Sequence, residues 1–172
     1  MSRYMNLIGQ NARKASLEKI DTKTKNKILK KYVFLLDKEK NSIIIENTKD
    51  IKFAFKKGLK KNLIDRLSIN HKKLDDIKNS INKIIKLKDP VDSILEKWIR
   101  PNGLRIKKVS IPIGVIGVIY ESRPNVTSDV ASLCFKSGNA VILKGGSEAI
   151  NTNKILAKLF RKALKENKVN EN

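Results

Sequence analysis

Two short polar segments in the last third of the sequence carry residue types that bind anions. Tyr120–Asn125 (YESRPN) and Lys144–Ser147 (KGGS) each follow an apolar run, and each contains one cation. Glycines let a backbone approach a ligand closely, while an arginine fork or a lysine ammonium suits a phosphate or a carboxylate. The second segment matches neither a Walker loop nor the G-x-G-x-x-G fingerprint. On these residues alone, a phosphate site and a plain strand-to-helix turn are equally open.

Several of these residues could instead cap a helix or form an ion pair within the chain. Ser147 is expected to cap the following helix, whose N-terminal amide groups favour an anion. Asn125 is expected to cap the helix after the first segment in the same way. Arg123 has two interpretations: a ligand for a carboxylate or phosphate group, or an ion pair with Glu121 or Asp129.

Apolar patterns around the two segments predict a βαβα unit. Residues 114–120 (GVIGVIY) and 140–144 (AVILK) are continuous apolar runs, typical of parallel strands that are buried on both faces. Residues 126–138 and 147–167 have helical spacing. This order indicates a parallel sheet with right-handed crossovers. Ligands of such sheets bind beyond the carboxyl ends of the strands, which is where both polar segments lie.

The residues before this unit predict helices and one hairpin. Helical patterns cover residues 7–87. Asp21-Thr22 can form the N-cap of one helix, Gly58 can end another, and Asp89-Pro90 ends the last one. Asn102-Gly103 then joins two strand-like runs within residues 93–111. This dipeptide is a strong hairpin signal, and a basic two-stranded ribbon must pack on another part of the chain or on a partner.

The composition indicates whether a nucleic acid is an expected partner. The 172 residues are 40% hydrophobic and carry a net charge of +21, from 38 Lys and Arg against 17 Asp and Glu. Such an excess of cations leaves a basic nucleic-acid-binding module open as an alternative function. Aromatic residues make up only 5%, which leaves few platforms for stacking on bases, so no nucleic-acid partner is expected.

Neither the lone cysteine nor the lone histidine predicts a catalytic or metal site. Cys134 lies on the apolar stripe of a predicted helix, which favours a buried structural thiol. His71 starts another helical segment without a cysteine or acid partner nearby in sequence. The N-terminus has no unbroken apolar h-region, so we expect no secretory signal, and the apolar run 109–120 is too short for a membrane span. We expect a cytoplasmic protein with no membrane partner and no metal.

The sequence resembles one enzyme family over nearly its whole length. Residues 111–149 (IPIGVIGVIYESRPNVTSDVASLCFKSGNAVILKGGSEA) closely resemble the gamma-glutamyl phosphate reductases, also called glutamate-5-semialdehyde dehydrogenases, of the aldehyde dehydrogenase superfamily. The resemblance extends to residues 63–69 (LIDRLSI), 89–94 (DPVDSI) and 101–114 (PNGLRIKKVSIPIG). The blocks YESRPNVT and KSGNAVILKGGSEA are long and unusual, which makes the resemblance specific.

The resemblance implies an aldehyde-dehydrogenase-like α/β fold. N-terminal helices precede the first βαβα half of a Rossmann-like parallel sheet, and a β-hairpin forms a ribbon. Residues 1–92 are the helical part of the cofactor-binding domain, 93–111 are an oligomerisation ribbon, and 112–172 are the first part of the NADP-binding domain. The family's catalytic domain is absent, so the chain corresponds to an N-terminal portion of a homo-oligomeric enzyme.

The implied reaction is the NADPH-dependent reduction of L-glutamyl 5-phosphate to L-glutamate 5-semialdehyde and phosphate, a step of proline biosynthesis. In this family a cysteine thiolate attacks the acyl phosphate, and NADPH then delivers hydride to the thioester. That cysteine belongs to the absent domain, so we assign no catalytic residue and expect this chain alone to be inactive. A non-catalytic interaction fragment is a further alternative.

The resemblance also implies the site residues. The lysine that ends the second strand, Lys144, approaches the adenosine ribose. Three residues on, NAD-preferring members of the superfamily often place a glutamate, where this sequence has Ser147. A small neutral residue does not repel a 2′-phosphate, which favours NADPH. The implied cofactor-binding residues are Lys144, Gly145, Gly146, Ser147, Ile119 and Tyr120, and the implied substrate-binding residues are Ser122, Arg123 and Asn125.

Overall fold

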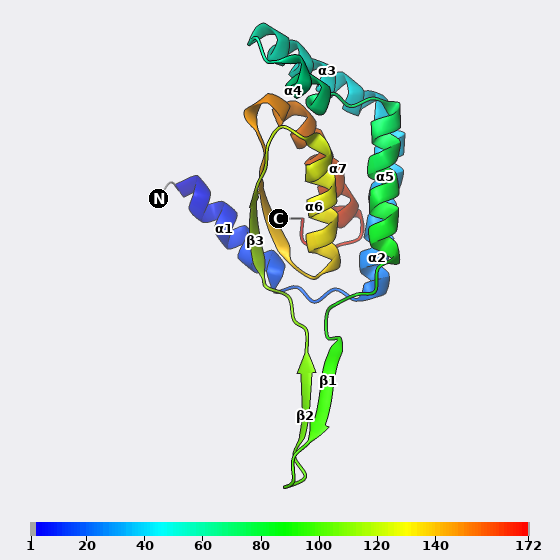
Figure 1. Ribbon diagram of the computed structural model, residues 1–172, viewed down its shortest axis with the longest axis vertical. Helices are drawn as coiled ribbons and strands as arrows, with labels where there is room; N and C mark the ends of the chain where they lie inside the picture. Colours follow the sequence, from blue (N-terminus) through cyan, green and yellow to red (C-terminus); the bar gives the residue numbers. More distant parts are fainter. Residues whose placement is uncertain (1–2, 172) are drawn as a thin grey trace.

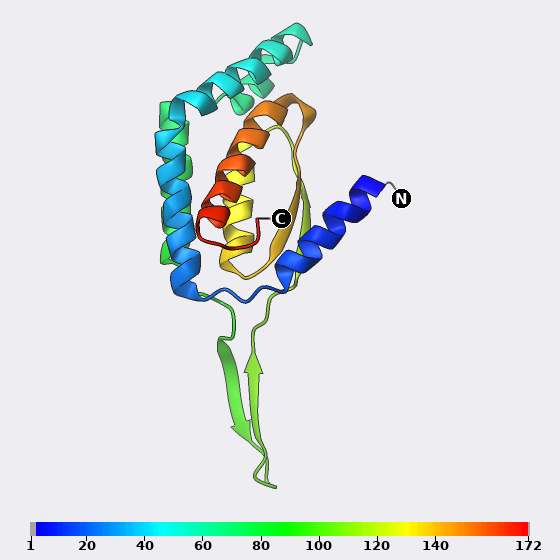
Figure 2. The same ribbon diagram turned by 180° about the vertical axis from the view of Figure 1, so that it is seen from behind.

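The computed structural model describes residues 3–171 as helices packed around a parallel pair of strands, with a hairpin that projects from them (Figures 1 and 2). None of the helices within this range is long and apolar enough to cross a membrane. The elements, in chain order, are α1 (Arg3–Ser16), α2 (Thr22–Lys38), α3 (Lys40–Lys56), α4 (Lys61–Leu67), α5 (His71–Lys86), β1 (Ile94–Ile99), β2 (Arg105–Val109), β3 (Val115–Ile119), α6 (Pro124–Lys136), β4 (Ala140–Lys144), the 3-10 turn η1 (Ser147–Ala149) and α7 (Ile150–Glu166).

The hydrophobic core lies among four helices. Helices α2 and α5 run side by side on the outside, and α6 and α7 pack between them and the strands (Figure 1). Tyr32 of α2 is fully buried and meets the edge of the Phe160 ring of α7 at 4.9 Å. Its hydroxyl lies 2.7 Å from the Ser128 hydroxyl of α6. The core therefore joins the N-terminal helices to the βαβα unit in one body.

Strands β3 and β4 are parallel, with Val115 opposite Ala140 and Ile119 opposite Lys144, as the sequence predicts. Helix α1 contacts the pair on one face and α6 packs on the other (Figure 1). The prediction that both strands are buried is wrong, because no residue of either strand is fully buried and Ile119 is 85% exposed. Two strands leave open edges on both sides, and α1 covers only part of its face.

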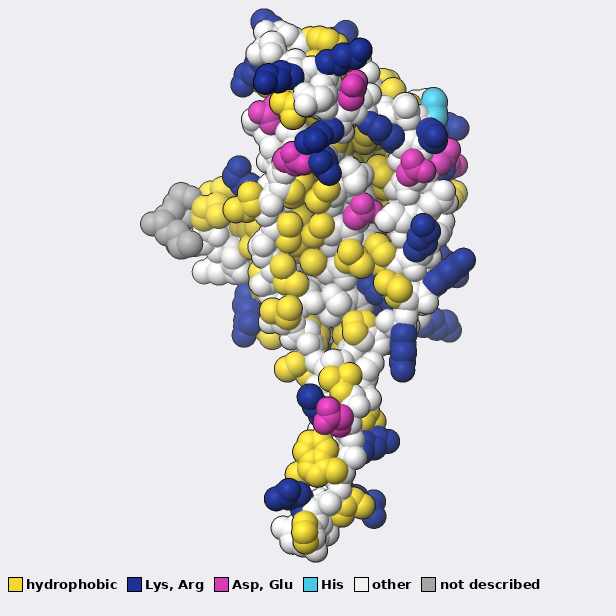
Figure 3. Space-filling model, in the orientation of Figure 1, with side chains coloured by type: hydrophobic (Ala, Val, Ile, Leu, Met, Phe, Trp, Pro, Cys, Tyr) yellow, Lys and Arg dark blue, Asp and Glu magenta, His cyan; other side chains and the backbone are white. Residues whose placement is uncertain are grey.

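The predicted hairpin forms an antiparallel ribbon, β1–β2, that extends away from the helices (Figure 2). Its tip is Pro101–Gly103, where Gly103 has φ of +84° and donates its amide to the Arg100 carbonyl at 2.9 Å. The ribbon exposes apolar side chains, among them Leu95 and Trp98 (Figure 3). A ribbon with this much apolar surface has no packing partner within the described chain.

Helix ends follow the local signals of the sequence. Asp21 caps α2, since its carboxylate accepts the Thr24 amide at 3.0 Å, and Asn70 caps α5 on the Lys73 amide at 2.8 Å. Gly58 ends α3 with φ of +70°, a conformation that glycine adopts without strain. The expected N-cap at residue 21 and the expected helix end at Gly58 are therefore confirmed.

A buried ion pair fixes the base of the ribbon. Lys25 of α2 is 2% exposed, and its ammonium lies 2.9 Å from the carboxylate of Asp89, just before β1. Burial raises the pKa of Asp89, but hydrogen bonds from Lys25, the Val91 amide and Thr22 outweigh it and hold the pKa below its usual value. The chain between α5 and the ribbon is thus anchored to the start of α2.

We predict that this ion pair makes stability fall in acid. Because the folded pKa of Asp89 is depressed, its contribution is complete above the unfolded value of about 3.9 and is lost as the pH falls through the folded value. Asp89→Asn leaves Lys25 buried without a counter-charge and should cost about 3 kcal/mol at neutral pH. Urea unfolding at several pH values measures both effects. Asp92→Asn, at an exposed position nearby, is the control and should change neither.

Candidate functional site

The two polar segments meet at one end of the β3–β4 pair. The Tyr120 amide donates to the Lys144 carbonyl at 3.1 Å, which extends the parallel register by one bond. The Ser122 hydroxyl then donates to Glu148 at 2.7 Å across the two loops. This hydrogen bond holds the pKa of Glu148 below its usual value, so the carboxylate is ionised at neutral pH. The loops are joined by the chain's own side chains.

The two glycines between β4 and η1 are needed for space. A Cβ atom on Gly145 would overlap the Asn153 side-chain amide and lie 2.9 Å from the Tyr120 ring. A Cβ atom on Gly146 would overlap the Ser122 hydroxyl. Side chains of the protein itself, those of Asn153, Tyr120 and Ser122, therefore fill the space that the two glycines leave free. A tightly packed turn is enough to explain why residues 145 and 146 are glycines.

Tyr120 belongs to a polar chain beneath this turn. Its hydroxyl lies 2.7 Å from that of Thr127 on α6, which in turn donates to the Asn153 side-chain oxygen on α7 at 2.9 Å. Burial raises the pKa of Tyr120, so the phenol stays protonated. Tyr120 therefore points toward the helices and fixes the loop.

Ile119 and Lys144 lie on the opposite face. They are partners in the register of the strand pair, and successive residues of a strand point to opposite sides, so both side chains point away from Tyr120. Both are exposed, and the side-chain ammonium of Lys144 has no hydrogen-bond or ion-pair partner among the described residues. Gly117 shares this face, with open space where a side chain would stand. Gly117, Ile119 and Lys144 form an exposed strip that ends in the free Lys144 ammonium, and exposed Ser147 follows three residues after Lys144.

Arg123 is paired within its own loop. Its Nε atom lies 2.5 Å from one Glu121 oxygen, and the Arg66 guanidinium of α4 lies 3.4 Å from the other. The ion pair with Glu121, one of the two sequence interpretations, is therefore present. All three side chains are about half exposed, so a ligand can still reach both guanidinium groups.

Neither predicted side-chain cap forms. Helix α6 begins at Pro124, and the Asn125 amide instead donates to Asp129 at 3.3 Å, so the predicted cap at Asn125 is wrong. Ser147 becomes the first residue of η1 and donates to Glu148 at 3.1 Å, so its predicted role as a cap is also wrong. The 3-10 turn shifts the start of α7 beyond the reach of Ser147.

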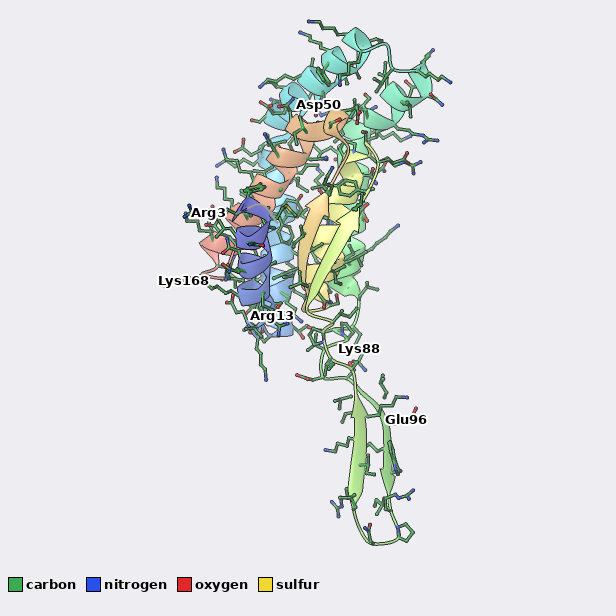
Figure 4. All side chains as sticks on the ribbon, turned by 90° about the vertical axis from the view of Figure 1, so that its left-hand side faces the viewer. Arg3, Arg13, Asp50, Lys88, Glu96 and Lys168 are labelled. Carbon is green, nitrogen blue, oxygen red and sulfur yellow. The ribbon has the colours of Figure 1, made fainter. Side chains whose placement is uncertain are left out.

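The start of α7 is capped by Asp50 of α3 (Figure 4). One carboxylate oxygen accepts the Asn151 amide at 3.1 Å, and the other accepts the Thr152 amide at 2.8 Å and its hydroxyl at 2.6 Å. Asp50 is 1% exposed. The anion expected at this helix N-terminus is therefore a protein carboxylate. Sequence reasoning missed it, because the two partners lie 101 residues apart.

Cys134 and His71 lie where the sequence predicts them. Cys134 is buried on α6, and burial raises the pKa of its thiol, which makes it a weak nucleophile. His71 is the exposed first residue of α5. Within residues 3–171, no three His, Cys, Asp or Glu side chains gather closely enough to hold a metal ion.

Comparison with known proteins finds close relatives. The chain is 46% identical to the gamma-glutamyl phosphate reductase of Thermodesulfovibrio yellowstonii over 155 residues, which are 90% of this chain and 37% of the relative. It is 48% identical to that of Clostridium botulinum over 162 residues, 93% of this chain and 39% of the relative. No family model matches the sequence. The chain thus spans less than half the length of the curated relatives that it matches.

Solved structures agree with these relatives. The gamma-glutamyl phosphate reductase of Thermotoga maritima matches 94% of this chain with a TM-score of 0.91 and 43% identity, and the chain covers 40% of it. The Saccharomyces cerevisiae protein matches 96% of this chain with a TM-score of 0.89 and 34% identity, and the chain covers 42% of it. An aldehyde dehydrogenase of Bacillus subtilis, at 18% identity and a TM-score of 0.62, shares the fold.

We predict that removing the tertiary cap destabilises the protein. Asp50→Ala leaves two backbone amides and the Thr152 hydroxyl without their acceptor in the interior and should lower the free energy of unfolding by about 3 kcal/mol. Urea denaturation measures the loss. Asp65→Ala, on the exposed face of α4, is the matched control and should change stability by less than about 0.5 kcal/mol. Equal effects of the two substitutions would contradict the role of Asp50.

We also predict that the turn does not tolerate a methyl group at residue 145. Gly145→Ala must displace both Asn153 and Tyr120 and should cost about 1–3 kcal/mol. Gly117→Ala is the control, because open space surrounds that position and its cost should be below about 1 kcal/mol. Thermal unfolding of both variants measures the two losses of stability, and the loss should be larger for Gly145→Ala.

Proposed function

We propose that this chain, a homologue of gamma-glutamyl phosphate reductases over 37–40% of their length, forms one wall of an NADPH site in an enzyme that reduces L-glutamyl 5-phosphate. The observation that carries this proposal is the similarity to the Thermotoga maritima structure, with a TM-score of 0.91 at 43% identity. The corresponding relatives are named for this reductase activity.

The strip on β3 and β4 suits the adenosine end of NADPH. Gly117 leaves the strip flat, and Ile119 offers an exposed apolar side chain for a ring to lie against. The free ammonium of Lys144 is a donor for a ribose hydroxyl or a phosphate oxygen. Asp50 accepts the Asn151 and Thr152 amides at the start of α7, so these two donors are not available to a cofactor phosphate. This leaves the exposed strip as the proposed contact of the adenosine end.

Ser147 favours NADPH over NADH in this arrangement. Its side chain is neutral and exposed, three residues after Lys144, so a 2′-phosphate held by Lys144 meets no opposing charge from residue 147. The nearby Glu148 carboxylate is held by the hydroxyls of Ser122 and Ser147. Gly145 and Gly146 support the loop, and Tyr120 holds it from behind.

The loop after β3 is proposed to hold the substrate. When bound, NADPH supplies the hydride for the reduction. Ser122 and Arg123 stand at the carboxyl end of β3, where their hydroxyl and guanidinium groups can hold the acyl phosphate, and Asn125 is the second residue of α6. The only cysteine of this chain is buried Cys134, so the chain by itself lacks the nucleophile and is inactive.

The β3–β4 pair is proposed to be the first half of a larger Rossmann-like sheet. Between α1, β4 and α7 lies a cavity of about 1050 Å³, lined by Ile8, Ala12, Val141, Leu143 and Phe160 among others. A cavity of this size beside an open strand edge accommodates additional strands and the side chains that they bring. Residues 1–92 and 112–172 together would then support one cofactor-binding domain.

The ribbon β1–β2 is proposed to bind a second copy of the protein. Its exposed apolar residues make self-association favourable, because an isolated two-stranded ribbon is barely stable in water. The high positive charge is less informative, since Figure 3 shows Lys and Arg scattered around the visible outline with no single cluster. A homo-oligomer therefore fits these observations better than a nucleic-acid complex.

We predict that Lys144 and Ser147 control the cofactor. Lys144→Ala should weaken NADPH binding by about 1–3 kcal/mol, through loss of a charge-assisted hydrogen bond. Ser147→Glu should weaken NADPH more than NADH, because its carboxylate repels the 2′-phosphate. Calorimetric titration of both cofactors measures these changes. Lys107→Ala, on the ribbon, is the matched control, and an effect equal to that of Lys144→Ala would reject the site.

We predict that the ribbon sets the association state. Sedimentation equilibrium should show the chain as an oligomer, and Trp98→Ser should shift it to monomer by removing the largest apolar side chain of β1. Lys97→Ser, at the adjacent position on the other face of the strand, is the control. A wild-type chain that stays monomeric would contradict the proposal.

A further inference from the structure

A second pocket, of about 300 Å³, lies between helices α4, α5 and α6. We propose that it binds the ammonium and carboxylate groups of an α-amino acid. The identification of that amino acid as the glutamyl part of the substrate rests on the proposed function above. The polar lining consists of Arg66 and Ser68 near the end of α4, Lys73, Asp76 and Ser80 of α5, and Asn125 and Asp129 of α6.

Asp129 provides the acceptor for an ammonium group. Its Oδ1 atom is buried and has no hydrogen-bond partner among the described residues. Its other oxygen accepts only a long bond, from the Asn125 amide at 3.3 Å. A buried carboxylate oxygen without a donor is costly, and a charged donor is the partner that relieves it best. Asp76, from the facing helix, adds a second acceptor to the same pocket.

Arg66 of α4 and Lys73 of α5 provide the positive charges for the carboxylate of the ligand. Arg66 contacts Glu121 only at 3.4 Å, so much of its guanidinium fork is available to a carboxylate. The Lys73 ammonium donates to the carbonyls of Asp65 and Ser68, at 2.5 and 2.7 Å, and Lys73 lines the pocket. Helix α6 has no acidic residue in its first turn, so its N-terminal end adds to the positive side.

The charges that line the pocket favour a ligand that carries both a positive and a negative group. Two cations and two carboxylates line the pocket, so a simple anion meets two acids and a simple cation meets two bases. A zwitterion satisfies both pairs at once. The volume admits a molecule as large as glutamate. Pro124 and Asn125 line the pocket at the end of the loop that carries Ser122 and Arg123. An amino acid held here can extend its side chain toward that loop.

Calorimetric titration of the full chain with L-glutamate tests the proposal. L-Glutamate should bind, and glutarate and 4-aminobutyrate, which lack the ammonium and the α-carboxylate respectively, should each bind at least about tenfold more weakly. Asp129→Asn and Asp76→Asn should weaken L-glutamate binding by a similar factor. Asp75→Asn is the matched control, because Asp75 neighbours Asp76 on α5 but pairs with Lys78 outside the pocket.

Three outcomes would overturn the proposal. They are no binding of L-glutamate, equal binding of glutarate, and equal loss of affinity in Asp75→Asn and Asp76→Asn. If Asp129→Asn fails to fold, as circular dichroism would show, the ligand series on the wild-type chain decides alone. NADPH affinity is measured on the same samples. NADPH binding without L-glutamate binding rejects this pocket alone, whereas the reverse result rejects the cofactor site alone.

Discussion

The carboxylate of Asp50 holds the first turn of α7, and the arrangement of both candidate sites depends on it. Asp50 lies one turn after Asn47 on α3, whose side-chain amide donates to the Leu67 carbonyl at 2.9 Å and to Thr152 at 3.1 Å. The Asn47 side-chain oxygen accepts the Ile69 amide at 2.8 Å. These two buried polar residues tie α3 to the start of α7 and to the connection between α4 and α5.

This anchoring has consequences for the loops. Because the start of α7 is fixed, Glu148 can accept the hydrogen bond of the Ser122 hydroxyl. Asn153 can likewise accept that of the Thr127 hydroxyl. These hydrogen bonds hold the two loops at the ends of β3 and β4. The loop residues that the sequence singled out as ligands thus divide into two groups. Tyr120, Gly145 and Gly146 build the turn. Lys144, opposite Ile119 in the strand register, and Ser147 stay exposed, and these are the residues that we propose contact the cofactor.

Local signals predicted most of the elements and few of the contacts between them. The order of strands and helices, the ribbon tip at Gly103 and the buried thiol of Cys134 follow from short-range pattern, and the structure has each of them. The caps at Ser147 and Asn125 failed, because a 3-10 turn and an N-terminal proline shift the helix starts. The Asp50 cap and the pocket at Asp129 join distant segments, which no local pattern reports.

We propose that the exposed strip of β3 and β4 binds NADPH and that the pocket between α4, α5 and α6 binds an amino acid. Backbone amide chemical shifts of the isotope-labelled chain test both parts in one titration series. NADPH should shift the amides of residues 117–119 and 144–147, and L-glutamate should shift those of residues 66–76 and 125–129. Shifts from both ligands at one common set of residues, or no shift in either region, would contradict two separate binding sites.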